Sequence, residues 1–86
     1  MDCLFWDLGF QPGGTCFEVS LRGSAANVFL VDAEEFAAYQ ADEEYEYHGG
    51  FYDFTPLTLQ VPYDYDWFLV VDGNERRVTV SFEEIT

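Results

Sequence analysis

The chain has 86 residues, with 17 acidic side chains against three arginines and a formal net charge of −14. Aromatic residues make up 20% of it and hydrophobic residues 49%, which argues against an intrinsically disordered acidic chain, because such chains are poor in aromatic side chains. Charge also excludes direct binding to nucleic acid or to an anionic membrane, since both need lysine or arginine to neutralise phosphate. A chain of this length is expected to form a single domain over residues 1–86.

The first part of the chain shows strand patterns separated by turns. Residues 4–8 are predicted to form a short strand that ends at Gly9, and the Pro-Gly-Gly of residues 12–14 is typical of a turn. Residues 15–22 alternate apolar and polar side chains, which predicts a strand with one buried face. The continuous apolar run of residues 27–31 predicts a more deeply buried strand. The inward positions of the alternating strand are Thr15, Phe17, Val19 and Leu21.

A short helix is predicted next, over about residues 33–40. Asp32 is a suitable N-cap, and Glu35 stands three positions later, as in a capping box. Phe36 and Tyr39 are three positions apart, so their rings share one side of the helix. We therefore expect the helix to press these two rings on the sheet.

The segment after the helix is acidic and rich in tyrosine. Over residues 42–47 we expect Tyr45 and Tyr47 on one face of a strand, with the glutamates on either side of Tyr45 on the other face. Gly49-Gly50 is predicted to form a turn or a bulge. Residues 51–54 are a candidate strand, which the following Thr-Pro should end.

The last part of the chain predicts three more strands. Residues 57–61 alternate, residues 67–71 form an apolar run, and residues 76–82 alternate again. The Asp-Gly-Asn of residues 72–74 is a hairpin signal between the last two. Strands at this spacing, with turn residues between them, indicate a mainly β fold: a compact antiparallel β-sandwich or small barrel with the one helix of about residues 33–40.

The cellular compartment and the state of the two cysteines are predicted together. No basic region followed by an apolar run precedes Cys3, and no stretch is long and apolar enough to span a membrane. We expect a cytoplasmic protein in which Cys3 and Cys16 are thiols. A disulfide between them is the alternative, if two neighbouring strands align the pair.

A set of motifs in a fixed order gives the chain a family resemblance. The motifs are Trp6-Asp7-Leu8-Gly9, Ser24-Ala25-Ala26-Asn27-Val28, Phe36 with Tyr39, Tyr47-His48-Gly49-Gly50, Thr55-Pro56, Val61-Pro62, Trp67 and Val70-Val71-Asp72. Their order and spacing resemble a small bacterial domain-of-unknown-function family, whose members occur alone or joined to TIR domains. The resemblance implies a β-sandwich-like fold in the cytoplasm of a bacterial host cell, and no assigned activity.

The chain departs from that family in one segment. Between the positions of Tyr39 and Tyr47, the family tends to be rich in lysine and arginine, whereas this chain has Ala-Asp-Glu-Glu-Tyr-Glu. The resemblance therefore implies a scaffold on which the sign of the surface charge is reversed, as in an acidic divergent member.

Two interpretations of the acidic residues stay open. A run of like charge is usually a solvated surface that keeps a protein soluble. A field of a single sign, however, also steers a protein toward a basic partner, and exposed tyrosines supply contact area and stack on arginine. The candidate partner-binding residues are Asp42, Glu43, Glu44, Tyr45, Glu46, Tyr47, Asp53, Asp64 and Asp66.

Catalytic and metal-binding patterns are weak by comparison. The aspartates at positions 53, 64 and 66 could supply oxygen ligands, but the chain has no calcium loop of the Asp-x-Asp-x-Asp-Gly type. His48 is the sole histidine, so with two cysteines it makes no zinc set, and we expect it to be a turn residue. No nucleophile motif or phosphate-binding glycine loop is found. We expect no cofactor, no metal and no enzymatic activity.

These observations predict a binding protein. The leading hypothesis is an inhibitor that occupies the basic nucleic-acid-binding surface of a partner protein by imitating nucleic acid, as a phage counter-defence protein of the anti-CRISPR kind would. The first alternative is an immunity or antitoxin protein that neutralises a basic toxin. The second is a ligand-sensing or oligomerising module of a bacterial defence system. Formation of a stable homo-oligomer would favour this second alternative.

Overall fold

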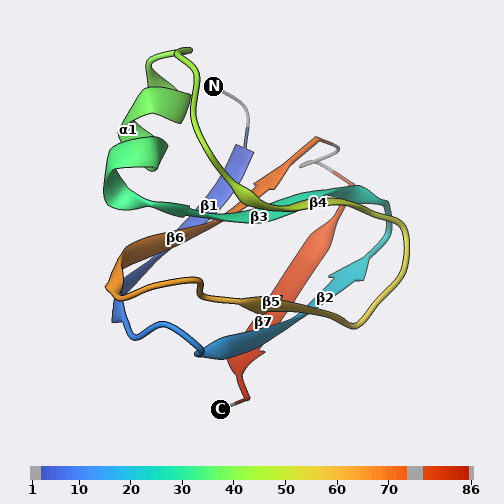
Figure 1. Cartoon of the computed structure of the whole chain (residues 1–86). Helices are drawn as coiled ribbons and strands as arrows, with labels where there is room; N and C mark the ends of the chain where they lie inside the picture. The colour runs from blue at the N-terminus through green and yellow to red at the C-terminus, as the bar shows by residue number, and fades with distance from the viewer. Residues whose placement is uncertain (1–2, 74–76, 86) are drawn as a thin grey trace.

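The computed structural model describes residues 3–73 and 77–85, which form seven strands and one helix (Figure 1). The elements in chain order are β1 (Cys3–Gln11), β2 (Cys16–Arg22), β3 (Ala26–Asp32), α1 (Ala33–Gln40), β4 (His48–Tyr52), β5 (Leu57–Gln60), β6 (Tyr65–Asp72) and β7 (Thr79–Glu84).

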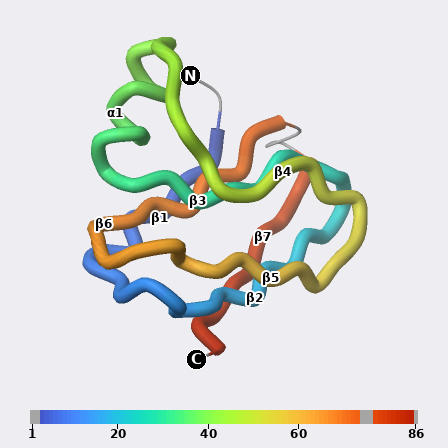
Figure 2. The backbone as a smooth tube through the Cα atoms, in the orientation of Figure 1, coloured from blue at the N-terminus to red at the C-terminus, as the bar shows by residue number. Residues whose placement is uncertain are grey.

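The strands make two antiparallel sheets. The larger sheet has the order β1-β6-β3-β4 and the smaller has the order β5-β2-β7. The two sheets lie as two layers, and α1 and the segment after it lie above the larger sheet (Figure 2). The predicted mainly β, sandwich-like fold with one short helix over residues 33–40 is therefore confirmed.

The space between the sheets holds the main core. Each strand contributes alternate residues to it, because side chains along a strand point to opposite faces. The predicted alternation of β2 is confirmed, with its inward residues buried. The buried members of this core are Phe17, Val19, Leu21, Ala26, Val28, Leu30, Leu57, Leu59, Val61, Trp67, Leu69, Val71 and Val78.

The larger sheet is also apolar on its outer face, where a second cluster forms. β3 and β6 are the central strands, and their continuous apolar runs supply one set of residues to each face. Phe36 and Tyr39 of α1 are buried against this outer face, as the helix pattern predicts. The ring of Phe36 stacks on that of Phe68, with their centroids 4.2 Å apart. The buried members of this outer cluster are Phe29, Val31, Phe36, Tyr39 and Val70.

The prediction that the first strand ends at Gly9 is wrong. β1 continues to Gln11 past a shift in its register against β6 between Asp7 and Gly9. Gly9 has a positive φ of 70°, which glycine adopts without steric strain, and its N–H donates to Asp7 Oδ1 at 2.9 Å. The glycine therefore marks a bulge inside the strand rather than a strand end.

The prediction of a turn or a bulge at Gly49-Gly50 is also wrong. Both glycines lie inside β4, paired with Phe29 and Val28 of β3. Gly49 has a φ of 149°, and a Cβ there would overlap the Val28 carbonyl oxygen and lie 2.7 Å from Phe29 Cα. Glycine is needed at position 49 because the backbone of β3 approaches closely there. The prediction of a turn did not consider this second use of glycine.

The strand boundaries on either side of these glycines also differ from prediction. Residues 43–47 are not a strand, and β4 begins only at His48. The candidate strand over residues 51–54 is wrong beyond Tyr52, where β4 ends and a bend begins. His48 is a strand residue and not a turn residue, and its ring packs edge-on against Trp67 at 5.7 Å.

The predicted hairpin at residues 72–74 is not formed. β6 lies between β1 and β3 in the larger sheet, whereas β7 pairs with β2 in the smaller one, so the chain crosses between sheets. Position 74 lies outside the described residues. The last strand has the predicted alternation, with Val78 buried and Thr79 exposed.

The two cysteines lie in different sheets, Cys3 on β1 and Cys16 on β2. Both are thiols, as expected, and the alternative of a disulfide between them is not supported. None of the helices in the described ranges is long and apolar enough to cross a membrane.

Candidate functional site

The start of α1 is fixed by its cap. Asp32 is the N-cap, and its Oδ1 accepts a hydrogen bond of 2.9 Å from the Glu35 N–H, as predicted. The Glu35 side chain, however, reaches forward to the segment after the helix, where its Oε2 accepts from the Glu46 N–H at 2.7 Å. Glu35 therefore links the first turn of the helix to a residue eleven positions later.

The way α1 ends fixes the direction of the residues that follow it. The N–H of Asp42 donates to the Tyr39 carbonyl at 3.2 Å, and the N–H of Glu43 donates to the Ala38 carbonyl at 2.9 Å. This pair of bonds is a Schellman motif, which needs a left-handed residue after the helix. Asp42 takes that conformation with a φ of 60°, in a position where glycine is usual and short polar residues are tolerated.

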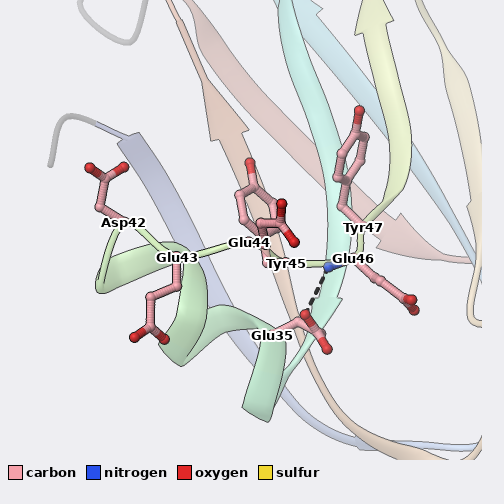
Figure 3. Close-up of a pocket in the computed structure, with 7 residues that line it drawn as sticks. All are labelled: Glu35, Asp42, Glu43, Glu44, Tyr45, Glu46 and Tyr47. Carbon is pink, nitrogen blue, oxygen red and sulfur yellow. Dashed lines mark hydrogen bonds between the residues drawn. The ribbon is translucent and has the colours of Figure 1, made fainter.

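From Glu43 the chain runs down to β4 without a regular element (Figure 2). The Schellman motif holds its start, and the Glu35 contact holds Glu46 near its end. In between, Tyr45 is half-buried in the outer cluster. Tyr45 and Tyr47 point to the same side of the segment, whereas Glu46 points away from them (Figure 3). The prediction that Tyr45 and Tyr47 lie on one face of a strand and the two glutamates on the other is wrong, because this segment is not a strand, although Glu46 does point away from the two tyrosines.

The acidic side chains of this segment surround an open concavity of about 720 Å³. In the described part of the chain, the structure gives the carboxylates of Asp42, Glu43 and Glu44 no hydrogen-bond donor, and all three residues are exposed. The concavity brings together six of the nine candidate residues, with Glu35 added. We call its lining the acidic segment; it consists of Glu35, Asp42, Glu43, Glu44, Tyr45, Glu46 and Tyr47.

The other three candidate residues lie elsewhere. Asp53 follows β4 and lines a separate hollow of about 270 Å³. Asp64 accepts a hydrogen bond of 2.7 Å from the Gly13 N–H, so it holds the turn after β1. Asp66 is exposed on β6, opposite Phe10 of β1. The fold does not gather these aspartates with the acidic segment.

The tyrosines divide between core and surface. Tyr47 is 53% exposed, and Tyr63 and Tyr65 are also exposed, whereas Tyr45 and Tyr52 are half-buried. Three of these five tyrosines can therefore contact a partner at the surface.

Tyrosine hydroxyls are important donors to carboxylates in this arginine-poor chain. Tyr39 donates to Asp72 Oδ2 at 2.7 Å, and burial together with this bond raises the pKa of Tyr39 well above its usual range. Tyr63 donates to Asp32, which raises the pKa of Tyr63 to about 12, and its partial burial adds to the effect. Each phenol keeps its proton because a phenolate beside a carboxylate would repel it. A third such bond joins Tyr65 to Glu34 at 2.8 Å.

A smaller cavity lies beside the acidic segment and shares its two tyrosines. It has a volume of about 210 Å³. The ring centroids of Phe29 and Tyr47 are 5.4 Å apart, and those of Tyr45 and Tyr47 are 5.7 Å apart. Sequence reasoning missed this cavity because the pairing of β3 with β6 brings its other residues together. We call it the aromatic slot; its lining is Asn27, Phe29, Tyr45, Tyr47, Gly50 and Asp72.

The described arginines lie far from the acidic segment. Arg22 ends β2, whose arrowhead is at the opposite end of the molecule from α1 (Figure 1). Arg77 is next to it, because a Cβ on Gly23 would overlap the Arg77 carbonyl oxygen. The described arginines therefore do not neutralise the acidic segment. Among the described residues, no group of three or more histidine, cysteine or acidic residues is arranged to hold a metal ion.

Fold and site together define a small two-sheet β protein that presents acids and aromatic rings above one sheet. The comparison with family models matches residues 4–84 to a family described as a domain of unknown function, DUF1883. The chain belongs to this family, in agreement with its resemblance to a small domain-of-unknown-function family. The comparisons with curated proteins and with solved structures found no match.

Proposed function

We propose that this protein binds a basic protein through the acidic segment and occupies a surface that would otherwise bind nucleic acid. The setting that we propose is a bacterial cell, and the target class is a nucleic-acid-binding protein such as those of phage-defence systems. The observation that supports the proposal most is the position of Asp42 and Glu43 at the carboxyl end of α1.

That position is electrostatically unfavourable for a carboxylate. The carboxyl end of a helix carries a partial negative charge, which favours cations and disfavours anions. The last turn of α1 has no basic residue, and Asp42, Glu43 and Glu44 follow it directly. An arrangement that served only solubility would gain from mixed charges here. A cationic partner would relieve the repulsion, so binding it is favoured.

The geometry of the segment also suits an imitation of nucleic acid. Glu43, Glu44 and Glu46 follow each other along a run that is held at both ends. Because the run is already ordered, binding loses less conformational entropy than it would for a free loop.

The experiment compares two charge-reversal variants of the tagged protein. The site variant is Glu43→Lys/Glu44→Lys/Glu46→Lys, which spares Asp42 because its left-handed backbone disfavours lysine. The control is Glu18→Lys/Glu83→Lys/Glu84→Lys on the smaller sheet, which changes the net charge equally. Proteins captured from a bacterial lysate are identified, and DNA is tested as a competitor for each.

The proposal expects a basic nucleic-acid-binding protein that DNA displaces from the bait. The site variant should lose it, whereas the control should retain it at physiological salt. Equal capture by the wild-type protein and the site variant at low salt would overturn the proposal. A captured protein that DNA does not displace would disprove the imitation of nucleic acid.

A further inference from the structure

We propose that the aromatic slot receives one arginine side chain of the partner and holds its guanidinium group between aromatic rings and the Asp72 carboxylate. This inference rests on the proposed function and adds to it the chemistry of the anchoring residue. It involves Phe29, Asn27 and Asp72, which lie outside the acidic segment.

The size of the slot fits a side chain better than a free ligand. Small-molecule pockets usually have volumes of about 300–1,000 Å³, whereas the slot has about 210 Å³. It opens next to the acidic concavity, since Tyr45 and Tyr47 line both. A basic segment lying along the acids would therefore have the slot within reach of a neighbouring side chain.

The lining of the slot offers a cation two kinds of contact. The rings of Tyr45 and Tyr47, with centroids 5.7 Å apart, lie at the opening over the buried ring of Phe29, and a cation over the face of such a ring is attracted by the ring quadrupole. Asp72 supplies a carboxylate at the same cavity. Aromatic faces beside a carboxylate are the surroundings that a guanidinium group prefers.

The Asp72 carboxylate is held in place for this role. Tyr39 is buried, and its hydroxyl donates to Asp72 Oδ2 at 2.7 Å. In the described ranges, no buried side-chain oxygen or nitrogen lacks a partner, so an oxygen of Asp72 without a donor must be open to solvent. An arginine can reach that oxygen without breaking the bond to Tyr39. Asn27, opposite Asp72 in the β3–β6 register, adds an amide at the rim.

Arginine is favoured over lysine on physical grounds. A guanidinium group is planar, stacks on aromatic rings and is more weakly hydrated than an ammonium group. It therefore loses less hydration on entering a slot with aromatic walls. Its fixed fork of donors also matches a carboxylate.

The test is a titration of the 86-residue protein with three peptides, followed by NMR. They are acetyl-Ala-Arg-Ala-amide, its lysine counterpart and its citrulline counterpart, which keeps the shape of arginine without its charge. We expect the arginine peptide to bind most tightly, on the order of tenfold over the citrulline peptide, and to shift the signals of Phe29, Tyr47 and Asp72. Equal binding of the arginine and citrulline peptides would overturn the proposal.

Two variants and a control locate the binding. Asp72→Asn retains an acceptor for Tyr39 and should weaken the arginine peptide about tenfold. Tyr47→Leu does not touch that hydrogen bond and should also weaken it, which guards against a folding defect in the first variant. Glu83→Gln/Glu84→Gln on the smaller sheet is the control, since it removes two charges that line neither the slot nor the acidic segment. It should change the affinity less than about twofold at physiological salt, where exposed charges are screened.

The outcomes separate this inference from the proposed function. If Asp72→Asn weakens the arginine peptide no more than the control does, the negative charge of the whole protein attracts the cation and the slot proposal fails. A different result is that the slot binds the arginine peptide while the wild-type protein and the charge-reversal variant capture the same partner equally from the lysate. That result would contradict the proposed function and leave the slot proposal standing.

Discussion

The inner face of the larger sheet is covered by a second sheet and by mostly aliphatic side chains, whereas its outer face is covered by aromatic rings, a helix of eight residues and an acidic segment. On the inner face, Trp67 is fully buried and its Nε1 donates to the Tyr63 carbonyl at 3.0 Å. On the outer face, Tyr39 combines a buried ring with a hydroxyl bonded to a carboxylate.

The difference lies in how the two faces meet water. The inner face excludes it by packing, so its residues determine stability. The outer face is only partly covered, and its rings are edged by carboxylates that stay hydrated or bonded to hydroxyls. Partly exposed aromatic rings beside charges are typical of binding surfaces. Stability therefore depends mainly on the inner face, and we propose the outer face as the one that binds a partner.

The largest expected effect is on the inner face. Trp67→Ala should lower the free energy of unfolding by about 3–5 kcal/mol, because it leaves a cavity between the sheets. Native proteins have a total stability of about 5–15 kcal/mol, so this variant should lose a large fraction of its stability. Urea unfolding followed by circular dichroism measures the change. A loss below about 1 kcal/mol would show that the inner face is not the stabilising one.

The next effect distinguishes two adjacent glycines of β4. Gly49→Ala should cost about 3 kcal/mol, because its Cβ would overlap the Val28 backbone and its φ of 149° strains any other residue. Gly50→Ala is the matched control: no atom lies within 4 Å of the Cβ position, so its effect should stay within about 1 kcal/mol. Thermal unfolding of both variants tests this. Equal losses would mean that β4 does not pair closely with β3.

The inner and outer faces of the larger sheet also differ in how well the sequence predicts them. The inner face was predictable, since alternation along β2 and the apolar run of β3 depend only on local pattern. The cap at Asp32 is local too. The outer face was less so: the Tyr39–Asp72 bond joins residues 33 positions apart through the pairing of β3 with β6. The pair Gly49-Gly50 was misread because glycine serves turns and close backbone contacts alike.

A smaller effect concerns a hydroxyl at the edge of the outer face. The hydrogen bond to Asp32 raises the pKa of Tyr63 from about 10 in the unfolded chain to about 12. The bond therefore stabilises the fold fully below pH 10, and its contribution is lost between pH 10 and pH 12. Tyr63→Phe should cost about 1 kcal/mol at pH 7. Its difference from the wild-type protein should disappear toward pH 12.

Urea unfolding at pH 8, 10 and 11 measures that difference directly. The other tyrosines titrate in both proteins, so subtracting the two stabilities isolates position 63. A stability difference that stays constant across this pH range would contradict the bond between Tyr63 and Asp32. The start of α1 would then not be linked to the segment before β6.

The smallest effect has the opposite sign and lies within the acidic segment. Asp42→Asn/Glu43→Gln should raise stability by about 0.3–1 kcal/mol for each charge removed at low salt, because carboxylates oppose the helix dipole there. Asparagine tolerates the left-handed backbone of position 42. The control, Asp53→Asn/Asp66→Asn, removes the same charge away from the carboxyl end of α1 and should stabilise less. Equal gains in melting temperature would assign the effect to general self-repulsion, and then the segment would be a solvated surface without a special affinity for cations.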